Sequence, residues 1–281
     1  MEARRDVQGV AVPAFLYGTA WKEQRTEELV RLALQQGFLG IDTANQRKHY
    51  FEAAVGDALA AAIAAGGVRR EDVFLQTKFT SIDGQDRRLP YDADADTATQ
   101  VRQSAAVSLE HLRTDVIDSF VLHGPSFRHG VAREDAEAWQ AMEALHDAGT
   151  VRLLGVSNVS LEQLATFHRQ ARVKPAFVQN RCFASAGWDG DVRAFCAANG
   201  VVYQGFSLLT ANPHALRSRP VADAAARTGR TAAQVVFRFA LAVGMIPLTG
   251  TTSAVHMRED LACLEFDLTA DEVRAIERAE G

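Results

Sequence analysis

Short apolar stretches alternate with longer segments of helical period along the whole chain. This alternation is typical of βαβ units, in which helices connect parallel strands. The apolar stretches predict eight strands, at residues 15–20, 39–43, 73–78, 117–123, 151–157, 177–181, 201–206 and 245–249. Eight strands separated by helices either lie open as a doubly wound sheet or close into a barrel.

The connection after the first strand favours the closed arrangement. Residues 16–21 read LYGTAW and lack the GxGxxG motif of nucleotide-binding open sheets. A length of 281 residues also falls in the usual size range of one β/α barrel. We therefore predict an α/β fold of the (β/α)8 TIM-barrel class, with residues 1–281 as a single domain.

Helix boundaries are marked by capping signals. Gly149 is the predicted stop of the helix that contains Trp139, Met142 and Leu145 on one face. Residues 81–96 form the longest irregular segment, and a loop of that length is usually functional or disordered. Capping boxes are predicted for three pairs: Ser160 with Gln163, Thr231 with Gln234, and Thr269 with Glu272.

Composition narrows the classes of partner. The net charge is −5, and no run of Lys or Arg forms the basic stripe that nucleic acid or an anionic membrane requires. The longest apolar stretches are too short to span a bilayer, and MEARRDVQGV at the amino terminus lacks the apolar segment of a secretory signal. Three widely spaced cysteines, Cys182, Cys196 and Cys263, fit neither a disulfide framework nor a zinc ribbon. We expect a cytoplasmic protein, monomeric or weakly dimeric, whose partner is a small molecule.

Polar residues end several predicted strands, where the active site of a barrel lies. Lys78 ends a buried strand and needs a partner for its charge, and Asp42 at the end of the neighbouring strand is the natural one. Such a pair beside a phenol lowers the pKa of that phenol, which makes Tyr50 the candidate proton donor and His123 the candidate group that orients a substrate oxygen. The alternative interpretation is an inert core salt bridge and an interior histidine.

Five motifs occur in the order and spacing found in one enzyme family. They are GIDTA, LQTKF and DSFVLHGP, which contain Asp42, Lys78 and His123, followed by GVSN at 155–158 and VQN at 178–180. From about residue 15 to residue 274 the chain resembles the aldo-keto reductases, and DTANQRKHYFEAAVG and TKFTSIDGQD look closest to a branch of small fungal, plant and bacterial enzymes that includes α-keto amide reductases.

The resemblance implies a barrel that binds NADPH without a Rossmann motif and reduces aldehydes, ketones, keto esters or keto amides to alcohols. Its catalytic tetrad falls on Asp42, Tyr50, Lys78 and His123. The nicotinamide passes a hydride to the carbonyl carbon, and the tyrosine protonates the developing alkoxide. Two other classes stay open: an NADPH-binding sensor or scaffold without turnover, and a barrel isomerase or aldolase that uses Lys78 as a Schiff-base amine.

The position of the tyrosine is irregular. The commonest family pattern places it five residues after the aspartate, where this chain has Arg47, whereas Tyr50 comes eight residues after Asp42. His49 is the alternative donor, but a neutral imidazole is a poor acid near pH 7 and a lysine cation disfavours imidazolium. We therefore predict Tyr50 as the acid.

The resemblance also implies cofactor contacts. Ser157, Asn158 and Gln179 correspond to residues that bond the nicotinamide carboxamide, and Phe206 to an aromatic that stacks on the ring, with barrel core as its alternative role. The remaining contacts are Ser207 and Leu209 at the pyrophosphate and Thr19 near the ribose.

The adenosine end departs from the family pattern. Leu248 stands where many relatives have lysine, and His256 where they have arginine. Gly250 and Thr251, with the helix that follows, are expected to bind phosphate through backbone N–H groups. Asp260 lies nearby, either at the cofactor or on a solvated helix face. We expect NADPH as the cofactor, with NADH as the alternative.

Aromatic residues near strand ends are candidates for a substrate pocket, with ordinary packing as their alternative role. His123 and His129 have no further spaced ligands, so no metal site is predicted. The pocket candidates are Trp21, Tyr91, Phe183 and Trp188.

Overall fold

A computed structural model describes residues 3–279 of the chain. Eight parallel strands form a closed barrel in the order β10-β3-β4-β5-β6-β7-β8-β9. The strands are β3 Leu16–Gly18, β4 Gly40–Asp42, β5 Phe74–Phe79, β6 Ile117–Leu122, β7 Val151–Ser157, β8 Phe177–Arg181, β9 Val202–Phe206 and β10 Ile246–Thr249. All eight predicted strands are confirmed, and so is the closed (β/α)8 barrel.

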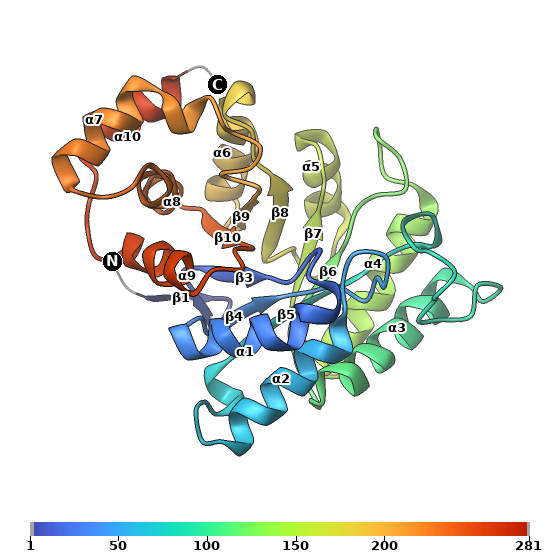
Figure 1. Ribbon diagram of the computed structural model, residues 1–281. Helices are drawn as coiled ribbons and strands as arrows, with labels where there is room; N and C mark the ends of the chain where they lie inside the picture. The colour runs from blue at the N-terminus through green and yellow to red at the C-terminus, as the bar shows by residue number, and fades with distance from the viewer. Residues whose placement is uncertain (1–2, 280–281) are drawn as a thin grey trace.

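Helices surround the barrel (Figure 1). Those that follow barrel strands are α1 Thr26–Gln36, α2 Glu52–Ala64, α3 Thr97–Leu112, α4 Arg133–Asp147, α5 Leu161–Gln170, α6 Gly190–Ala198, α8 Ala232–Ala242 and α9 Ala254–Leu261, and α7 Arg219–Thr228 and α10 Ala270–Arg278 are additional. Short 3-10 helices are η1 Glu23–Arg25, η2 Arg70–Asp72, η3 Ile82–Gly84, η4 Ala184–Asp189, η5 Ala215–Arg217 and η6 Ala262–Leu264. The three predicted capping boxes are present at the starts of α5, α8 and α10.

An amino-terminal hairpin closes the opposite end of the barrel from the site, and the sequence analysis missed it. Strands β1 Arg4–Val7 and β2 Val10–Pro13 pair antiparallel through a turn at Gln8 and Gly9, whose φ angles are 51° and 85°. The hairpin valines pack against residues at the amino ends of β3, β5, β8 and β10. The barrel is thereby plugged at this end.

The long loop at residues 81–96 has little regular structure but is held in place by hydrogen bonds. The 3-10 helix η3 is its one regular element, and Asp96 ends it by accepting the Thr99 N–H at 2.7 Å as the N-cap of α3. Within the loop, Gln85 Nε2 donates to Asn45 O at 2.9 Å and the Tyr91 hydroxyl to Thr80 O at 2.8 Å. These bonds fix the loop beside the ends of β4 and β5.

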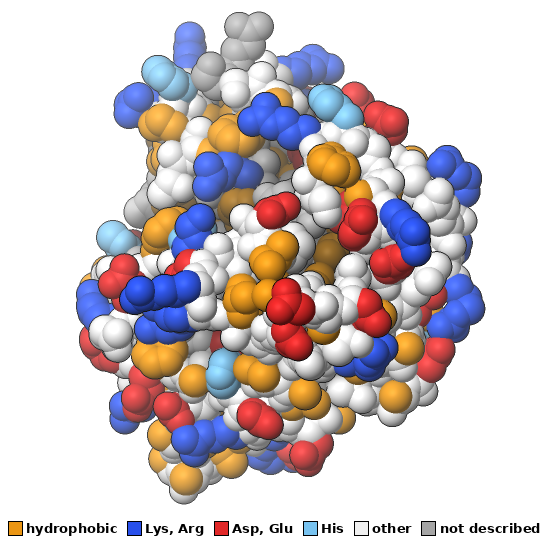
Figure 2. Space-filling view, turned by 90° about the vertical axis from the view of Figure 1, so that its right-hand side faces the viewer, with side chains coloured by type: hydrophobic (Ala, Val, Ile, Leu, Met, Phe, Trp, Pro, Cys, Tyr) orange, Lys and Arg blue, Asp and Glu red, His pale blue; other side chains and the backbone are white. Residues whose placement is uncertain are grey.

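Charged side chains of both signs are interspersed on the face shown in Figure 2, with hydrophobic side chains in small patches between them. Within residues 3–279, none of the helices is both long and apolar enough to cross a membrane.

Candidate active site

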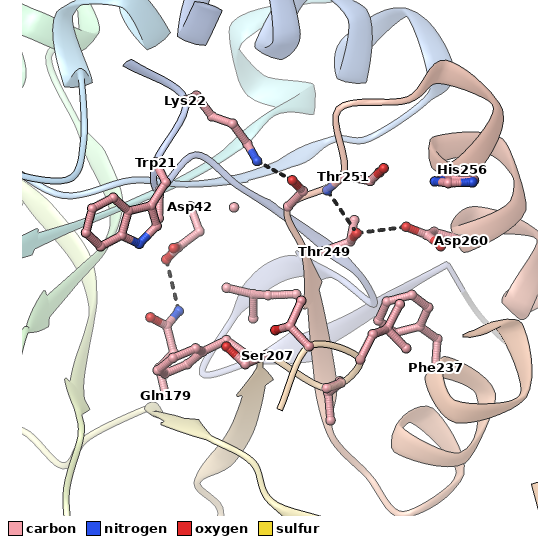
Figure 3. A pocket seen from close by; sticks show the side chains of 18 of the residues that line it. Trp21, Lys22, Asp42, Gln179, Ser207, Phe237, Thr249, Thr251, His256 and Asp260 are labelled. Carbon is pink, nitrogen blue, oxygen red and sulfur yellow. Dashed lines mark hydrogen bonds between the residues drawn. The ribbon is translucent and has the colours of Figure 1, made fainter. Parts of the chain in front are cut away.

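A cavity of about 650 Å³ lies at the carboxyl ends of the barrel strands (Figure 3). Its lining combines strand-end residues with residues of the loops after β3, β9 and β10. The predicted site residues that line it are Trp21, Asp42, Tyr50, His123, Ser157, Asn158, Gln179, Phe206, Ser207, Leu209, Gly250, Thr251, His256 and Asp260. The structure thus brings most of the predicted residues together in one place.

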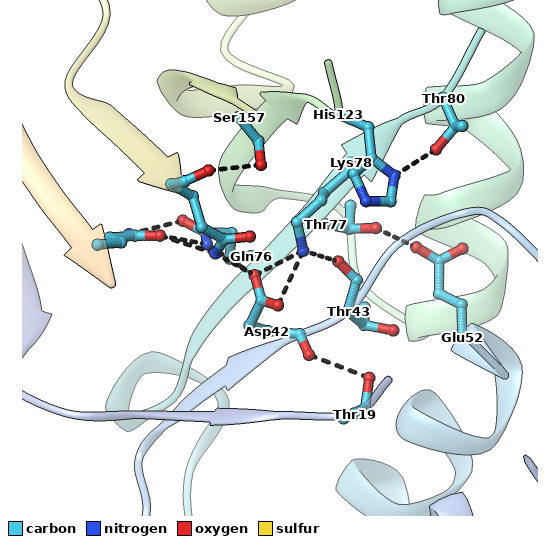
Figure 4. Close-up of polar contacts among 12 residues, drawn as sticks. Thr19, Asp42, Thr43, Glu52, Gln76, Thr77, Lys78, Thr80, His123 and Ser157 are labelled. Atoms are coloured by element: carbon cyan, nitrogen blue, oxygen red, sulfur yellow. Dashed lines mark hydrogen bonds and ion pairs between the residues drawn. The ribbon is translucent and has the colours of Figure 1, made fainter. Parts of the chain in front are cut away.

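Asp42 and Lys78 form a buried ion pair at the base of this cavity (Figure 4). The Lys78 ammonium lies 2.7 and 2.8 Å from the two Asp42 oxygens and donates its third hydrogen to Thr43 O at 2.7 Å. Burial lowers the pKa of Lys78, and the charge of Asp42 opposes this shift. Because all three N–H groups are bonded, the cation is compensated although its side chain is fully buried.

Tyr50 lies between β4 and α2, over the ion pair. The centre of its ring is 5.3 Å from Lys78 Nζ and 5.9 Å from the centre of the His123 ring. Burial raises the pKa of Tyr50 well above its ordinary value, and the Asp42 carboxylate adds to the rise. The expectation that the pair lowers this pKa is therefore wrong, because burial and the Asp42 carboxylate both favour the neutral phenol.

His123 follows β6 and is held by a hydrogen bond between its Nδ1 and Thr80 Oγ1 at 2.6 Å. Burial lowers the pKa of His123 to about 3, and the Lys78 cation contributes to the shift. The imidazole is therefore neutral near pH 7. The rival candidate, His49, stacks on Trp21 at 4.0 Å between ring centres and is not among the described residues that line the cavity.

Glu52 is a residue that the sequence analysis missed. It is the first residue of α2, 3% exposed, and its carboxylate accepts hydrogen bonds from the Thr77 hydroxyl, from the Ser108 hydroxyl at 3.2 Å and from His111 Nδ1 at 2.9 Å. These bonds tie the start of α2 to β5 and α3. Tyr50 lies two residues before this anchored helix start, and its N–H donates to Gln46 O at 3.0 Å.

The carboxamide candidates are bonded to one another and to the backbone. The Ser157 hydroxyl donates to Gln179 O at 2.6 Å, and Asn158 Nδ2 donates to His123 O at 2.8 Å. Gln179 Nε2 donates to Asp42 Oδ1 at 2.9 Å. The candidate cofactor residue Gln179 is therefore connected directly to the Asp42 carboxylate.

The far end of the cavity contains a cation that the sequence analysis missed. Lys22, in the loop after β3, lines the cavity and donates to Gly250 O. Thr249 donates to Asp260 Oδ2 at 2.7 Å, and burial raises the pKa of Asp260 to about 6. Asp260 is 4% exposed, so its alternative role on a solvated helix face is wrong.

Four predicted contacts are not brought to the cavity. Thr19 is fully buried and bonds Asp42 O at 3.0 Å, and Tyr91 is buried against Phe79. Trp188 is fully buried, packs on Phe239 with 5.0 Å between ring centres and donates to Ile276 O at 3.3 Å. Phe183 is 39% exposed and lies outside the lining. The pocket roles of Tyr91 and Trp188 and the ribose role of Thr19 are therefore wrong, because these side chains are buried away from the cavity. The pocket role of Phe183 stays a prediction.

The arrangement of possible metal ligands and the state of the three cysteines can be described for residues 3–279. Within residues 3–279, no group of three or more His, Cys, Asp or Glu side chains is arranged to hold a metal ion. Burial raises the pKa of each cysteine thiol to about 12, which leaves all three as thiols near neutral pH.

Comparison with known proteins identifies the family. The model of the Aldo/keto reductase family matches residues 15–280. An aldo-keto reductase from Mycolicibacterium vanbaalenii is 30% identical over 257 residues, covering 91% of this chain and 83% of that protein. The oxidoreductase YtbE of Bacillus subtilis is 28% identical over 272 residues, covering 96% and 89%. An aldose reductase structure from Schistosoma japonicum, 23% identical, matches with a TM-score of 0.82 over 99% of this chain and 91% of that one, and supports the fold. The chain belongs to the aldo/keto reductase family, whose oxidoreductases reduce carbonyl groups.

Proposed function

We propose that the protein is an NADPH-dependent reductase that converts aldehydes and ketones, including keto esters or keto amides, to alcohols. The observation that carries the proposal is the convergence of Asp42, Lys78, Tyr50 and His123 at the base of one cavity, next to Gln179. A carbonyl group placed there meets a phenol donor and a neutral imidazole together.

The lining fits a nicotinamide cofactor. Phe206 offers a half-buried aromatic ring, and Gln179 a side-chain oxygen that accepts no hydrogen bond from residues 3–279. At the other end, the Lys22 cation and the amino terminus of α9 offer compensation for phosphate charge. Ser207, Leu209, Gly250 and Thr251 supply contacts between the two ends. When bound, the reduced nicotinamide supplies the hydride.

The side chains then divide the remaining work. His123 Nδ1 is bonded to Thr80, so its Nε2 is the nitrogen left to hydrogen-bond the substrate oxygen. Tyr50 donates its proton to the developing alkoxide, while the Lys78 ammonium lies 5.3 Å from the centre of its ring. The raised pKa makes Tyr50 a weaker acid, but an alkoxide is a stronger base than a phenolate, so the proton transfer stays favourable.

The test is NADPH oxidation, followed by absorbance, with a panel of aldehydes, diketones and keto esters. Tyr50→Phe removes only the hydroxyl and should lower kcat by roughly a hundredfold or more, the low end of general-acid effects, with NADPH affinity nearly unchanged. His49→Ala should cost much less. Retained turnover in Tyr50→Phe would contradict the assignment of the acid. Tight NADPH binding without turnover of any carbonyl would support the sensor, and borohydride trapping of a substrate on Lys78 would support the Schiff-base enzyme.

We propose only a modest preference for NADPH over NADH. Charge-assisted contacts to the 2′-phosphate are the strong ones, and Leu248 and His256 replace the two permanent cations of many relatives. Comparable kcat/KM with NADH would contradict any preference. A preference of several thousandfold would reveal a phosphate clamp elsewhere in the cavity.

A further inference from the structure

Three glutamines and the catalytic aspartate meet inside the barrel. Gln76 belongs to β5, Gln179 to β8 and Gln204 to β9. Gln76 and Gln179 donate to Asp42 on β4, and Gln204 bonds both of these glutamines. Gln76 and Gln204 are fully buried, and Gln179 is 3% exposed. Since β5 and β9 are not neighbours in the barrel, the hydrogen bonds cross its interior.

The hydrogens of Gln179 are fully used in this network. Its Nε2 carries two hydrogens, and it donates to Asp42 Oδ1 at 2.9 Å and to Gln204 Oε1 at 3.0 Å. Gln204 and Gln76 also exchange two hydrogen bonds, since each donates to the other's side-chain oxygen, at 3.0 and 2.7 Å. The amide of Gln179 is therefore fixed by acceptors on two sides.

The network determines which polar group Gln179 shows to the cavity. Its Oε1 accepts no hydrogen bond from the described residues, and the side chain lines the cavity. The neighbouring donors are also occupied, since the Ser157 hydroxyl and both Asn158 Nδ2 hydrogens are bonded within the protein. This wall of the cavity therefore presents acceptors, and a carboxamide can offer donors only through its NH2 group.

We propose that Gln204 is a positioning residue that holds Gln179 so that its Oε1 accepts from the N–H of the nicotinamide carboxamide. The assignment rests on the proposed function, in which this cavity binds NADPH. Without the Gln204 oxygen, one N–H of Gln179 has no acceptor, and the amide is free to turn that N–H toward the cavity. Gln204 thus acts on the cofactor through Gln179 without touching it.

Two cofactor forms test the assignment by binding alone. NADP⁺ has the carboxamide NH2, whereas its 3-acetylpyridine analogue keeps the carbonyl and has a methyl group instead. Fluorescence titration of the full-length protein should show the analogue binding the wild type about tenfold or more weakly, because a largely buried acceptor loses its donor. In Gln204→Met this ratio should fall toward one.

Gln76→Met is the matched control. It also removes one buried glutamine from the network, but it leaves the Gln204 oxygen that accepts from Gln179, so the wild-type ratio should persist. Thermal melts of the three proteins separate loss of folding from loss of discrimination. Gln204→Leu provides a second apolar replacement if Gln204→Met does not fold.

The outcomes distinguish failure of the role of Gln204 from failure of the proposed function. Equal binding of both forms by the wild type, or an unchanged ratio in Gln204→Met or Gln204→Leu, overturns the role of Gln204 while cofactor binding stands. If Gln76→Met also binds NADP⁺ and its analogue equally well, the positioning role of Gln204 is overturned, because any damage to the network then has the same effect. Failure of the wild type to bind NADP⁺ at all overturns the proposed function, and this assignment with it.

Discussion

Protonation of His123 is expected to couple the stability of the protein to pH. Burial, with a contribution from the Lys78 cation, lowers the pKa of this imidazole from 6.5 to about 3. Between these values the unfolded chain binds a proton that the folded protein does not. The contribution to stability is therefore complete above about pH 6.5 and is lost as pH falls toward 3.

The size of the effect follows from the two pKa values. Between pH 7 and pH 4 the difference in proton binding amounts to roughly 3 kcal/mol of the free energy of unfolding. Domains are typically stable by about 5–15 kcal/mol, so one imidazole accounts for a substantial share of the loss in mild acid.

The assay is urea unfolding of the wild type and His123→Gln at pH 4, 5, 6 and 7. Glutamine does not titrate and keeps a polar group near Thr80. Asp260 acts in the opposite sense, because its pKa is raised to about 6 and its contribution is lost as pH rises through that value. It is common to both proteins and cancels in their difference. From pH 7 to pH 4 the wild type should lose about 3 kcal/mol of its free energy of unfolding relative to His123→Gln. Parallel curves would show that His123 is not held neutral by its surroundings, which would refute the reasoning.

Three further predictions concern other parts of the molecule. Asp42→Leu leaves the buried Lys78 cation without its carboxylate and should cost about 3–5 kcal/mol in urea unfolding at pH 7, with part recovered by adding Lys78→Met. Lys22→Met should weaken NADPH binding about tenfold or more in a fluorescence titration while the melting temperature changes little; unchanged affinity would remove the lysine from the cofactor site. Gly56→Ala places a Cβ 1.9 Å from a backbone carbonyl oxygen of α3 and should destabilise by about 1–3 kcal/mol, whereas Gly67→Ala, with its nearest atom at 3.5 Å, should be close to neutral.

Strands and helices that are marked by apolar stretches or capping residues in the sequence were predicted well. β7 and β8 have the bounds expected from the apolar stretches alone, and the helix that starts after Ser160 has the predicted capping box. Parallel barrel strands are buried on both faces, so they appear in the sequence as short apolar runs between helices. The hairpin of β1 and β2 has no such signal, because RRDV carries three charges and VAVP ends in proline.

The direction of a side chain near a strand end was harder to predict. Trp188 follows β8 closely enough to suggest a pocket role, but Gly187, Trp188 and Asp189 adopt left-handed backbone angles with φ of 67°, 54° and 57°. This turn directs the indole into the core against Phe239. Glycine and, less strongly, aspartate favour that conformation, but tryptophan does not, so the sequence did not indicate that Trp188 adopts it.

The buried glutamines show why part of the site follows from closure of the barrel. Gln76 is a single glutamine in the apolar strand FLQTKF. The residues next to it in the sequence do not indicate which side chain it bonds. The register pairs Asp42 with Gln76 and Gln179 with Gln204, which gives two pairs on separate strands. Only closure through β10 and β3 curves the sheet so that the two pairs face each other across the interior. The network around the Asp42 carboxylate therefore becomes predictable once the pairing of all eight strands is known.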